Sequence, residues 1–93
     1  MANNWNICQY AALMMMFAQV SGLLAGEMVH VIADAHIYDR HVPIVEQLIK
    51  AERFPAPVIK MNPEDDFYKF TADSFKLLKY KYNSFDEKIP IAI

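Results

Sequence analysis

A cluster of titratable and aromatic side chains occupies residues 34–41, which read DAHIYDRH. If the backbone is extended through Tyr38, alternate side chains project from the same edge, which places Asp34, His36 and Tyr38 together. A carboxylate, an imidazole and a phenol supply both hydrogen-bond donors and acceptors, so they suit a polar ligand such as a sugar. An alternative is a sheet end whose polar groups bond to their neighbours, since titratable clusters mark functional sites only statistically. The spacing alone leaves both interpretations open.

Metal binding is a second chemistry that these residue types allow. The histidines His30, His36 and His41, together with Asp34, are sufficient in number to hold an ion. Their spacings match no common zinc pattern, and the chain has no pair of cysteines. The sequence therefore predicts no metal site.

The single cysteine, Cys8, is a candidate nucleophile because reactive cysteines often lie in the first turns of a helix. Its sequence neighbours Ile7, Ala11 and Ala12 are apolar, however, and no histidine is near it in the sequence. We therefore predict that Cys8 is a small buried hydrophobic residue and not a catalytic one. A single cysteine also excludes an internal disulfide and is typical of a reducing cytosol.

A helix is expected from Trp5 to about Leu24, with Asn3 and Asn4 as candidate caps. This stretch contains no proline and is rich in Ala, Leu, Met and Gln, which favour helix. Apolar residues lie on nearly every side of it, and residues 14–17 (MMMF) alone cover a full turn. A helix that is apolar all round is predicted to be buried.

The chain has too little material to bury such a helix. It contains 93 residues, of which 55% are apolar, against about 45–50% in ordinary soluble domains. A chain this short buries only about 60–65% of its unfolded surface. We therefore expect an incomplete fold, whose apolar surface meets a missing segment, a second copy of the chain or a membrane.

Residues 27–37 are predicted to form a strand, because β-branched residues recur in it. Alternation divides its side chains between two faces. A mixed face carries Met28, His30, Ile32, Asp34 and His36, and a small apolar face carries Val29, Val31, Ala33 and Ala35. Both faces are expected to meet protein, and the polar face to line a pocket.

A second helix is expected from about Arg40 to Glu52, with Asp39 as its cap and Pro43 in its first turn, where proline is tolerated. Its inner stripe is predicted to consist of Val42, Val45, Leu48 and Ile49. Beyond it, residues 58–61 are expected to be extended, residues 62–66 to form a turn or a short helical turn, and residues 75–82 to form another strand. The apolar tail at residues 89–93 is expected to dock against protein.

Charge and hydropathy argue against two classes of partner. The net charge is −2, and acidic residues stand among the lysines, so no basic stripe of the nucleic-acid-binding type is present. The longest apolar stretch, residues 10–25, contains Gln19, Ser21 and Gly22 and falls short of the roughly 20 apolar residues of a transmembrane helix. The start of the chain carries no basic residue and does not resemble a signal peptide. The sequence thus predicts no nucleic acid, no membrane and a cytoplasmic location.

Three motifs follow one another along the chain: WNICQYA at residues 5–11, DAHIY at residues 34–38 with His41, and IPIAI at residues 89–93. They resemble, in this order, three elements of the thymidylate synthase family. These are an aromatic-Asn-Ile-x-x-Tyr-Ala helix start, an Asp-Thr-His-x-Tyr-x-x-His element and a Pro-Val-Ala-Ile ending. The interval of thirty positions from Asn6 to His36 also matches the family. The resemblance covers essentially the whole chain.

This resemblance implies an α/β (α+β) fold in which residues 1–93 are the C-terminal portion of a thymidylate synthase domain. In that three-layer fold, a long buried helix packs on a mixed sheet. The family forms dTMP from dUMP and uses 5,10-methylenetetrahydrofolate as one-carbon donor and reductant. By correspondence, Asn6 binds the pyrimidine edge, because an amide donates and accepts at once. His36 and Tyr38 correspond to the residues that hold the deoxyribose 3′-hydroxyl.

Other roles follow from the same resemblance. Trp5 takes the aromatic position beside the folate, and Ala92 and Ile93 belong to the terminal segment that closes over the site and excludes water. The implied partners are dUMP, folate, and either a homodimer mate or a complementary N-terminal chain. The homodimer contact is expected on the apolar face of residues 29–35.

The family's nucleophilic cysteine lies in a Pro-Cys-His stretch upstream of the matching region, and its phosphate-binding arginines and Arg-Ser-x-Asp element also lie upstream. None of these elements occurs in the 93 residues. Cys8 follows Asn6 and does not correspond to the nucleophile. Ile32 and Ala33 replace a Gly-Gly pair, and Ala35 replaces Thr. Because binding groups do not replace a nucleophile, we expect the chain alone to be inactive.

Two other functions fit parts of the sequence. A deoxycytidylate hydroxymethylase shares the fold and the folate, but Asp is expected at the pyrimidine position, so Asn6 favours uracil. A non-catalytic interaction module would need only the apolar surface. The retained residues Asn6, His36 and Tyr38 argue against a purely structural role.

Overall fold

The secondary structure consists of two α-helices, three 3-10 turns and two short strands. The computed structural model describes residues 3–83 and residue 88. The elements in chain order are α1 (Asn3–Val20), η1 (Asp39–His41), α2 (Val42–Lys50), β1 (Val58–Met61), η2 (Phe67–Lys69), η3 (Ala72–Ser74) and β2 (Phe75–Leu78).

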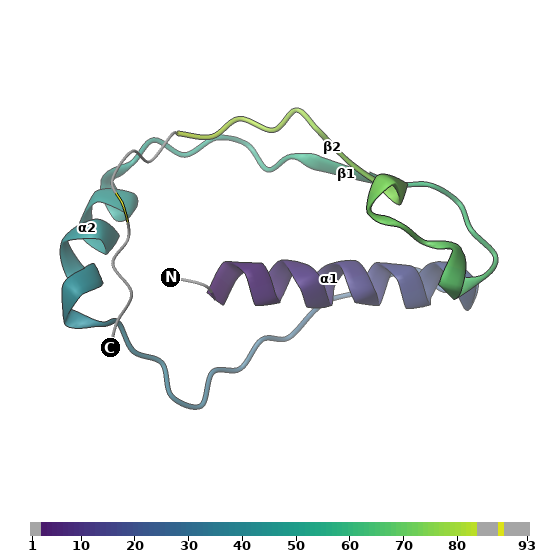
Figure 1. Ribbon diagram of the computed structural model, residues 1–93, viewed down its shortest axis with the longest axis horizontal. Coiled ribbons are helices and arrows are strands. Elements are labelled where there is room, and N and C mark those ends of the chain that lie inside the picture. Colours follow the sequence, from purple (N-terminus) through teal and green to yellow (C-terminus); the bar gives the residue numbers. More distant parts are fainter. Residues whose placement is uncertain (1–2, 84–87, 89–93) are drawn as a thin grey trace.

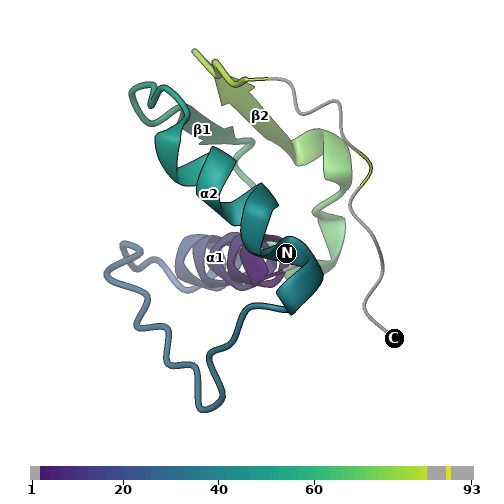
Figure 2. The ribbon, with the colours of Figure 1, turned by 90° about the vertical axis from the view of Figure 1, so that its left-hand side faces the viewer.

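The helices, the hairpin and the long connection between the helices form an open arrangement (Figure 1). Helix α1 lies beneath the β1–β2 hairpin, and α2 lies at one end of the molecule. The connection from α1 to α2 runs on the side of α1 that faces away from the hairpin (Figures 1 and 2). The Cα radius of gyration is 16.5 Å, whereas a compact domain of this length has about 12 Å. The chain is therefore less compact than a typical domain of its length.

Helix α1 ends where the sequence provides a glycine. Gly22 has φ = 71°, the left-handed conformation that only glycine adopts without cost. The backbone N–H of Leu23 donates to the carbonyl of Ala18 at 2.8 Å, and that of Gly22 donates to Gln19 at 3.2 Å. This pair of bonds is a Schellman motif, which satisfies the last carbonyls of a helix. The prediction of the helix is confirmed, although it ends four residues before Leu24.

Helix α1 is not buried, contrary to the prediction from its composition. Every described side chain of the helix is half-buried or exposed, and Trp5 is 80% exposed. Its main support is a stacked ring pair between Phe17 and Phe67 of η2, with centroids 4.8 Å apart. A helix that is apolar all round needs cover on all sides, and these residues cover one side.

The hairpin pairs β1 with β2 in antiparallel register, from Val58↔Leu78 to Met61↔Phe75. Both strands confirm sequence predictions, but β2 stops at Leu78 and does not reach Tyr82. The cause is Lys79, whose φ of 58° lies outside the β region and costs a non-glycine residue roughly 1–2 kcal/mol. In the described residues, the expected mixed sheet is reduced to these two antiparallel strands.

The loop that connects the two strands is held by hydrogen bonds between its own polar groups. The carboxylate of Asp66 accepts from the N–H of Tyr68 at 3.0 Å and caps η2. The Thr71 N–H donates to the Ser74 hydroxyl at 2.9 Å as part of a capping box at η3. The N–H of Asn62 donates to the Ser74 carbonyl at 2.8 Å, which ties the loop to the end of the ladder. The turn or short helical turn predicted at residues 62–66 lies later in the chain: residues 62–64 are irregular, residues 65–66 form a bend, and the 3-10 turn η2 begins at Phe67.

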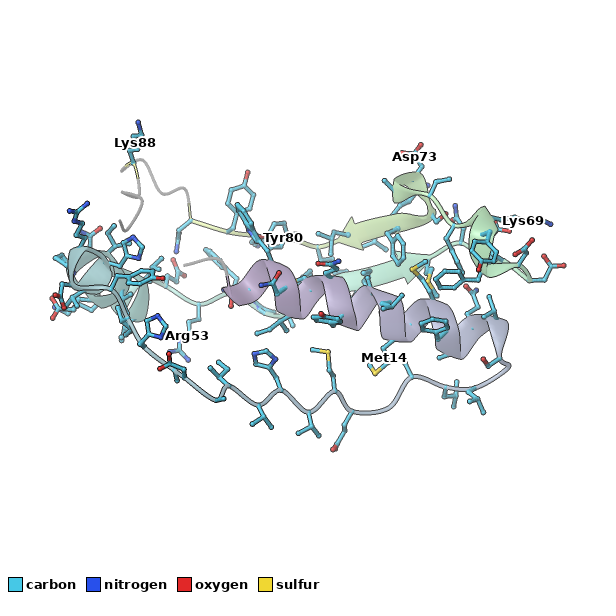
Figure 3. The ribbon with its side chains drawn as sticks, turned by 60° about the horizontal axis from the view of Figure 1, so that its bottom comes forward. Met14, Arg53, Lys69, Asp73, Tyr80 and Lys88 are labelled. Atoms are coloured by element: carbon cyan, nitrogen blue, oxygen red, sulfur yellow. The ribbon has the colours of Figure 1, made fainter. Side chains whose placement is uncertain are left out.

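The strand predicted at residues 27–37 is wrong. The backbone from residue 23 to residue 38 is extended or bent and belongs to no strand. A strand is completed by hydrogen bonds to a neighbour, and no described segment pairs with this one. Val29 and Val31 are 82% and 83% exposed as a result. Figure 3 shows the segment running alone below α1, with side chains directed to both sides.

Helix α2 confirms the second predicted helix, with Pro43 in its first turn. Asp39 is not its cap, because the chain enters through the 3-10 turn η1 and the N-cap of α2 is His41. The predicted inner stripe is also wrong: Ile49 is 65% exposed, and the buried residue of the helix is Ile44. Too little of the chain faces α2 to cover a stripe.

The side-chain oxygen of Gln19 is a buried polar atom whose replacement should change the stability of the fold. Gln19 Oε1 is buried and accepts no hydrogen bond from the described part of the chain, in an apolar hollow lined partly by Met15, Leu23 and Met61. Gln19→Met is expected to raise the free energy of unfolding by about 1 kcal/mol, because an unsatisfied buried acceptor costs about 1–3 kcal/mol. Urea denaturation followed by circular dichroism measures the change. Gln9→Met, at an exposed position of the same helix, is the control, and a loss of stability in Gln19→Met would contradict the prediction.

Candidate functional site

The candidate site begins with the imidazole of His36. Its Nδ1 lies 2.8 Å from the backbone carbonyl of Asp34 and 3.6 Å from the Asp34 carboxylate. A carbonyl only accepts, so this contact assigns the proton of a neutral His36 to Nδ1. Nε2 is then the acceptor of the ring, and the His36 side chain is 51% exposed. The local turn at Asp34 therefore orients a histidine that can accept a hydrogen bond from a ligand.

Tyr38 stands between two imidazoles. Its ring meets that of His36 edge-on at 5.2 Å and that of His41 edge-on at 5.5 Å. The N–H of His41 also donates to the Tyr38 carbonyl at 2.8 Å, which closes the turn η1. His41 is 5% exposed and Tyr38 is 49% exposed. A buried histidine at the start of α2 thus holds one edge of an accessible tyrosine.

An open hollow of about 560 Å³ lies beside this group, lined by Ile32, Asp34, Ala35, His36 and Ile37. Small-molecule sites typically measure about 300–1,000 Å³. The hollow offers a carboxylate and an imidazole on an apolar wall, which suits a ligand with a polar ring and hydroxyl groups. Three residues of the predicted mixed face line this hollow, but Ala35 of the predicted apolar face lines it too, so the two faces are not separated as they would be in a strand.

The remaining candidate residues are only partly assembled. Asn6 and Trp5 are exposed in the first turns of α1, which lie at the same end of the molecule as η1 and α2 (Figures 1 and 2). Within residues 3–83, no hydrogen bond or ring contact joins either residue to His36 or Tyr38. Ala92 and Ile93 lie outside the described residues. The structure therefore brings His36 and Tyr38 together and leaves their relation to Asn6 a prediction.

Three further observations concern the cysteine, metal binding and membrane spans. Cys8 is exposed, so the prediction of a buried cysteine is wrong, for the same reason that α1 is uncovered. Across the described ranges, no three His, Cys, Asp or Glu side chains are grouped closely enough to hold a metal ion. No helix of the described residues is long and apolar enough to cross a membrane.

His41 is the residue whose part the sequence did not reveal. The sequence marks it as a possible metal ligand and as part of a motif, but its ring contact with Tyr38 depends on the helical turn that begins at Asp39. The spacing of three positions from Tyr38 is the available signal, since such residues share a face in a helical turn.

Known proteins share both the sequence and the fold. The thymidylate synthase of Bacillus phage phi3T is 43% identical over 83 residues, which are 88% of this chain and 30% of that protein. Thymidylate synthase 1 of Bacillus subtilis (strain 168) matches with the same identity and coverage. The family model described as "Thymidylate synthase" matches residues 1–93. The chain belongs to the thymidylate synthase family.

The fold agrees with this membership. The solved structure titled thermostable thymidylate synthase A from Bacillus subtilis superposes with a TM-score of 0.85 at 40% identity, covering 98% of this chain and 32% of that chain. The α+β class and the thymidylate synthase resemblance are thereby confirmed. This chain spans about a third of the length of the thymidylate synthases that it matches.

Proposed function

We propose that this chain is the nucleotide- and folate-binding portion of a thymidylate synthase that forms dTMP from dUMP. The observation that supports the proposal is the His36–Tyr38 pair beside an open hollow. A deoxyribose 3′-hydroxyl has one hydrogen to donate and lone pairs to accept. Nε2 of His36 accepts from it and the Tyr38 hydroxyl donates to it, so the pair satisfies both capacities.

The pyrimidine is assigned to Asn6. Its carboxamide accepts from N3–H and donates to O4 of uracil, which a purely accepting carboxylate would not do. In the open chain Asn6 is exposed, and the proposal requires a completing segment that closes the end of the molecule shared by α1 and α2. The uracil edge then meets an amide with both a donor and an acceptor.

Trp5 is assigned to the folate. Its ring is 80% exposed on the first turn of α1, which leaves an aromatic face free to stack on a planar heterocycle. When bound, 5,10-methylenetetrahydrofolate supplies the one-carbon unit and the reducing equivalents. Ala92 and Ile93 would close over the ligands and exclude water.

Catalysis is assigned to a complex of this chain with another chain, and not to these 93 residues alone. By the family resemblance, Cys8 does not occupy the nucleophile position, and it lies exposed on α1. The exposed apolar segment around Val29 and Val31 is the surface proposed for a second copy or a complementary N-terminal chain. The proposed setting is the cytoplasm, with no metal.

A titration of dUMP tests this function. The chain is mixed with the part of the B. subtilis thymidylate synthase that it does not match, and dUMP binding is followed by calorimetry, with each chain alone as a control. Binding that appears or strengthens on mixing supports the proposal. Mixing that produces a complex without dUMP binding would favour an interaction module, the alternative suggested by the exposed apolar residues of α1.

Tyr38→Phe is expected to weaken dUMP binding by the mixed protein roughly tenfold, because one hydrogen bond to a ligand is worth about 0.5–1.5 kcal/mol. The same substitution should leave the affinity for 2′,3′-dideoxyuridine monophosphate unchanged, since that ligand lacks the 3′-hydroxyl. Tyr68→Phe, at a position that is 90% exposed in η2, is the matched control. An equal loss for both nucleotides would refute the assigned contact.

A further inference from the structure

The hairpin ladder stops abruptly at the pair Val58↔Leu78. On one side, Pro55 and Pro57 carry no backbone N–H and so cannot donate to a continuing ladder. On the other side, Lys79 takes the left-handed conformation, with φ = 58°. Residues 52–57 and 79–83 still run alongside each other from the hairpin toward α2 (Figure 1). In this part of the described chain, no backbone hydrogen bond joins them.

The two segments are tied again at their far end. The side-chain amide of Asn83 donates to the carbonyl of Glu52 at 3.1 Å. Between this bond and the end of the ladder lies a hollow of about 380 Å³, lined by Pro55, Ala56, Lys79 and Lys81. None of these residues lines the hollow beside His36. The hollow is therefore a separate feature that the proposed nucleotide site does not use.

The charged residues that line this hollow in the described part of the chain, Lys79 and Lys81, have the same sign. Lys79 and Lys81 are two positions apart, and the tyrosines that alternate with them, Tyr80 and Tyr82, stack on each other at 5.1 Å. Within residues 3–83 and 88, the ion pairs of His36 with Asp34 and of Lys69 with Asp65 involve neither of these two lysines. Within the described part of the chain, Lys79 and Lys81 thus line one small hollow and form no ion pair with a carboxylate.

The backbone conformation of Lys79 also suggests a functional role for this hollow. A long side chain in the left-handed region is strained, and observed strain of this kind is a reason to look for function. Here it ends the ladder at the position where Lys79 and Lys81 come to line one hollow. Ammonium groups only donate, and they bind phosphate oxygens as point charges. We propose that this hollow binds a small phosphate-bearing anion.

The volume favours a small molecule over a polymer, because a hollow of about 380 Å³ lies at the lower end of the usual range for small-ligand sites. The hairpin also supplies an internal control. Lys60 and Lys76 are direct cross-strand partners in the ladder, both are exposed, and neither lines the hollow. They carry the same charge on the same hairpin without the enclosing walls.

Titration of inorganic pyrophosphate into the full chain tests the proposal, with heteronuclear NMR and calorimetry as readouts. Saturable shifts are expected in the amides of residues 52–57 and 79–83. The double variant Lys79→Asn with Lys81→Gln is expected to weaken binding at least roughly tenfold, because charge-assisted contacts to phosphate are lost. Asn tolerates the left-handed conformation, so the backbone of the hollow is retained. The double variant Lys60→Gln with Lys76→Gln is expected to change the dissociation constant less than roughly twofold, as for a surface charge screened by solvent.

Three results would overturn the proposal: no saturable binding of pyrophosphate by the unaltered chain, an equal loss in both double variants, or shifts that centre on residues 34–38. A short oligothymidylate that binds through all four lysines, while pyrophosphate does not bind, would also overturn it in favour of a nucleic-acid surface. Each readout is independent of dUMP binding, so failure here leaves the proposed function standing, and the reverse also holds.

Discussion

Purified alone, the 93-residue chain is expected to form no detectable dTMP from dUMP and 5,10-methylenetetrahydrofolate. The proposed function assigns to this chain groups that bind and orient the ligands, and assigns the nucleophile to another segment. Removing a nucleophile while retaining binding groups typically lowers turnover by roughly four to six orders of magnitude. The increase in absorbance on dihydrofolate formation, together with chromatography of dTMP, measures the rate.

Mixing is expected to restore turnover. The partner is the part of the B. subtilis thymidylate synthase that this chain does not match, and the reference is that part mixed with the segment of its own enzyme that corresponds to this chain. Because the two segments are 40% identical and share the fold, the exposed apolar face of α1 should find a complementary surface. Clear turnover by the purified chain would show that the nucleophile has been placed wrongly.

The second large effect concerns the choice of pyrimidine. Asn6→Asp in the mixed protein is expected to shift the ratio of dUMP to dCMP affinity toward dCMP by roughly 100-fold, since each mismatched buried polar group costs about 1–3 kcal/mol. The carboxylate accepts from the amino group of cytosine but faces O4 of uracil with no donor. Competitive binding of the two nucleotides measures the ratio.

Asn4→Asp is the matched control, because it adds the same charge two positions away in the first turn of α1. It is expected to change both affinities equally and to leave the ratio unaltered. If Asn6→Asp also leaves the ratio unaltered, Asn6 does not meet the pyrimidine edge, and the alignment of the chain's first motif with the family carries no functional meaning.

Features that depend on neighbouring residues could be predicted from the sequence. Helix α1 and the entry of Pro43 into α2 follow from residues within one or two turns. A helix closes its hydrogen bonds within its own segment, so residues far away in the sequence change little about where it begins and ends. The motifs that carry the family membership are likewise local strings in a particular order.

Features that depend on distant residues could not be predicted. Residues 27–37 have the composition of a strand and yet remain unpaired, because a strand is completed only by another segment. The exposure of Cys8 and of α1 has the same origin: apolarity predicts burial, but burial needs material to supply it. Composition states what a segment favours and not whether a partner is present.

The sequence by itself determined the helices, the hairpin strands and the family, and it singled out His36 and Tyr38. Only the tertiary structure showed His41 buried against the Tyr38 ring and the lysine-lined hollow beyond the hairpin. Both depend on how the backbone leaves a regular element, through a 3-10 turn in one case and a left-handed lysine in the other. The backbone conformation at the end of a helix or strand depends on the surrounding tertiary contacts, which the residue type alone does not specify.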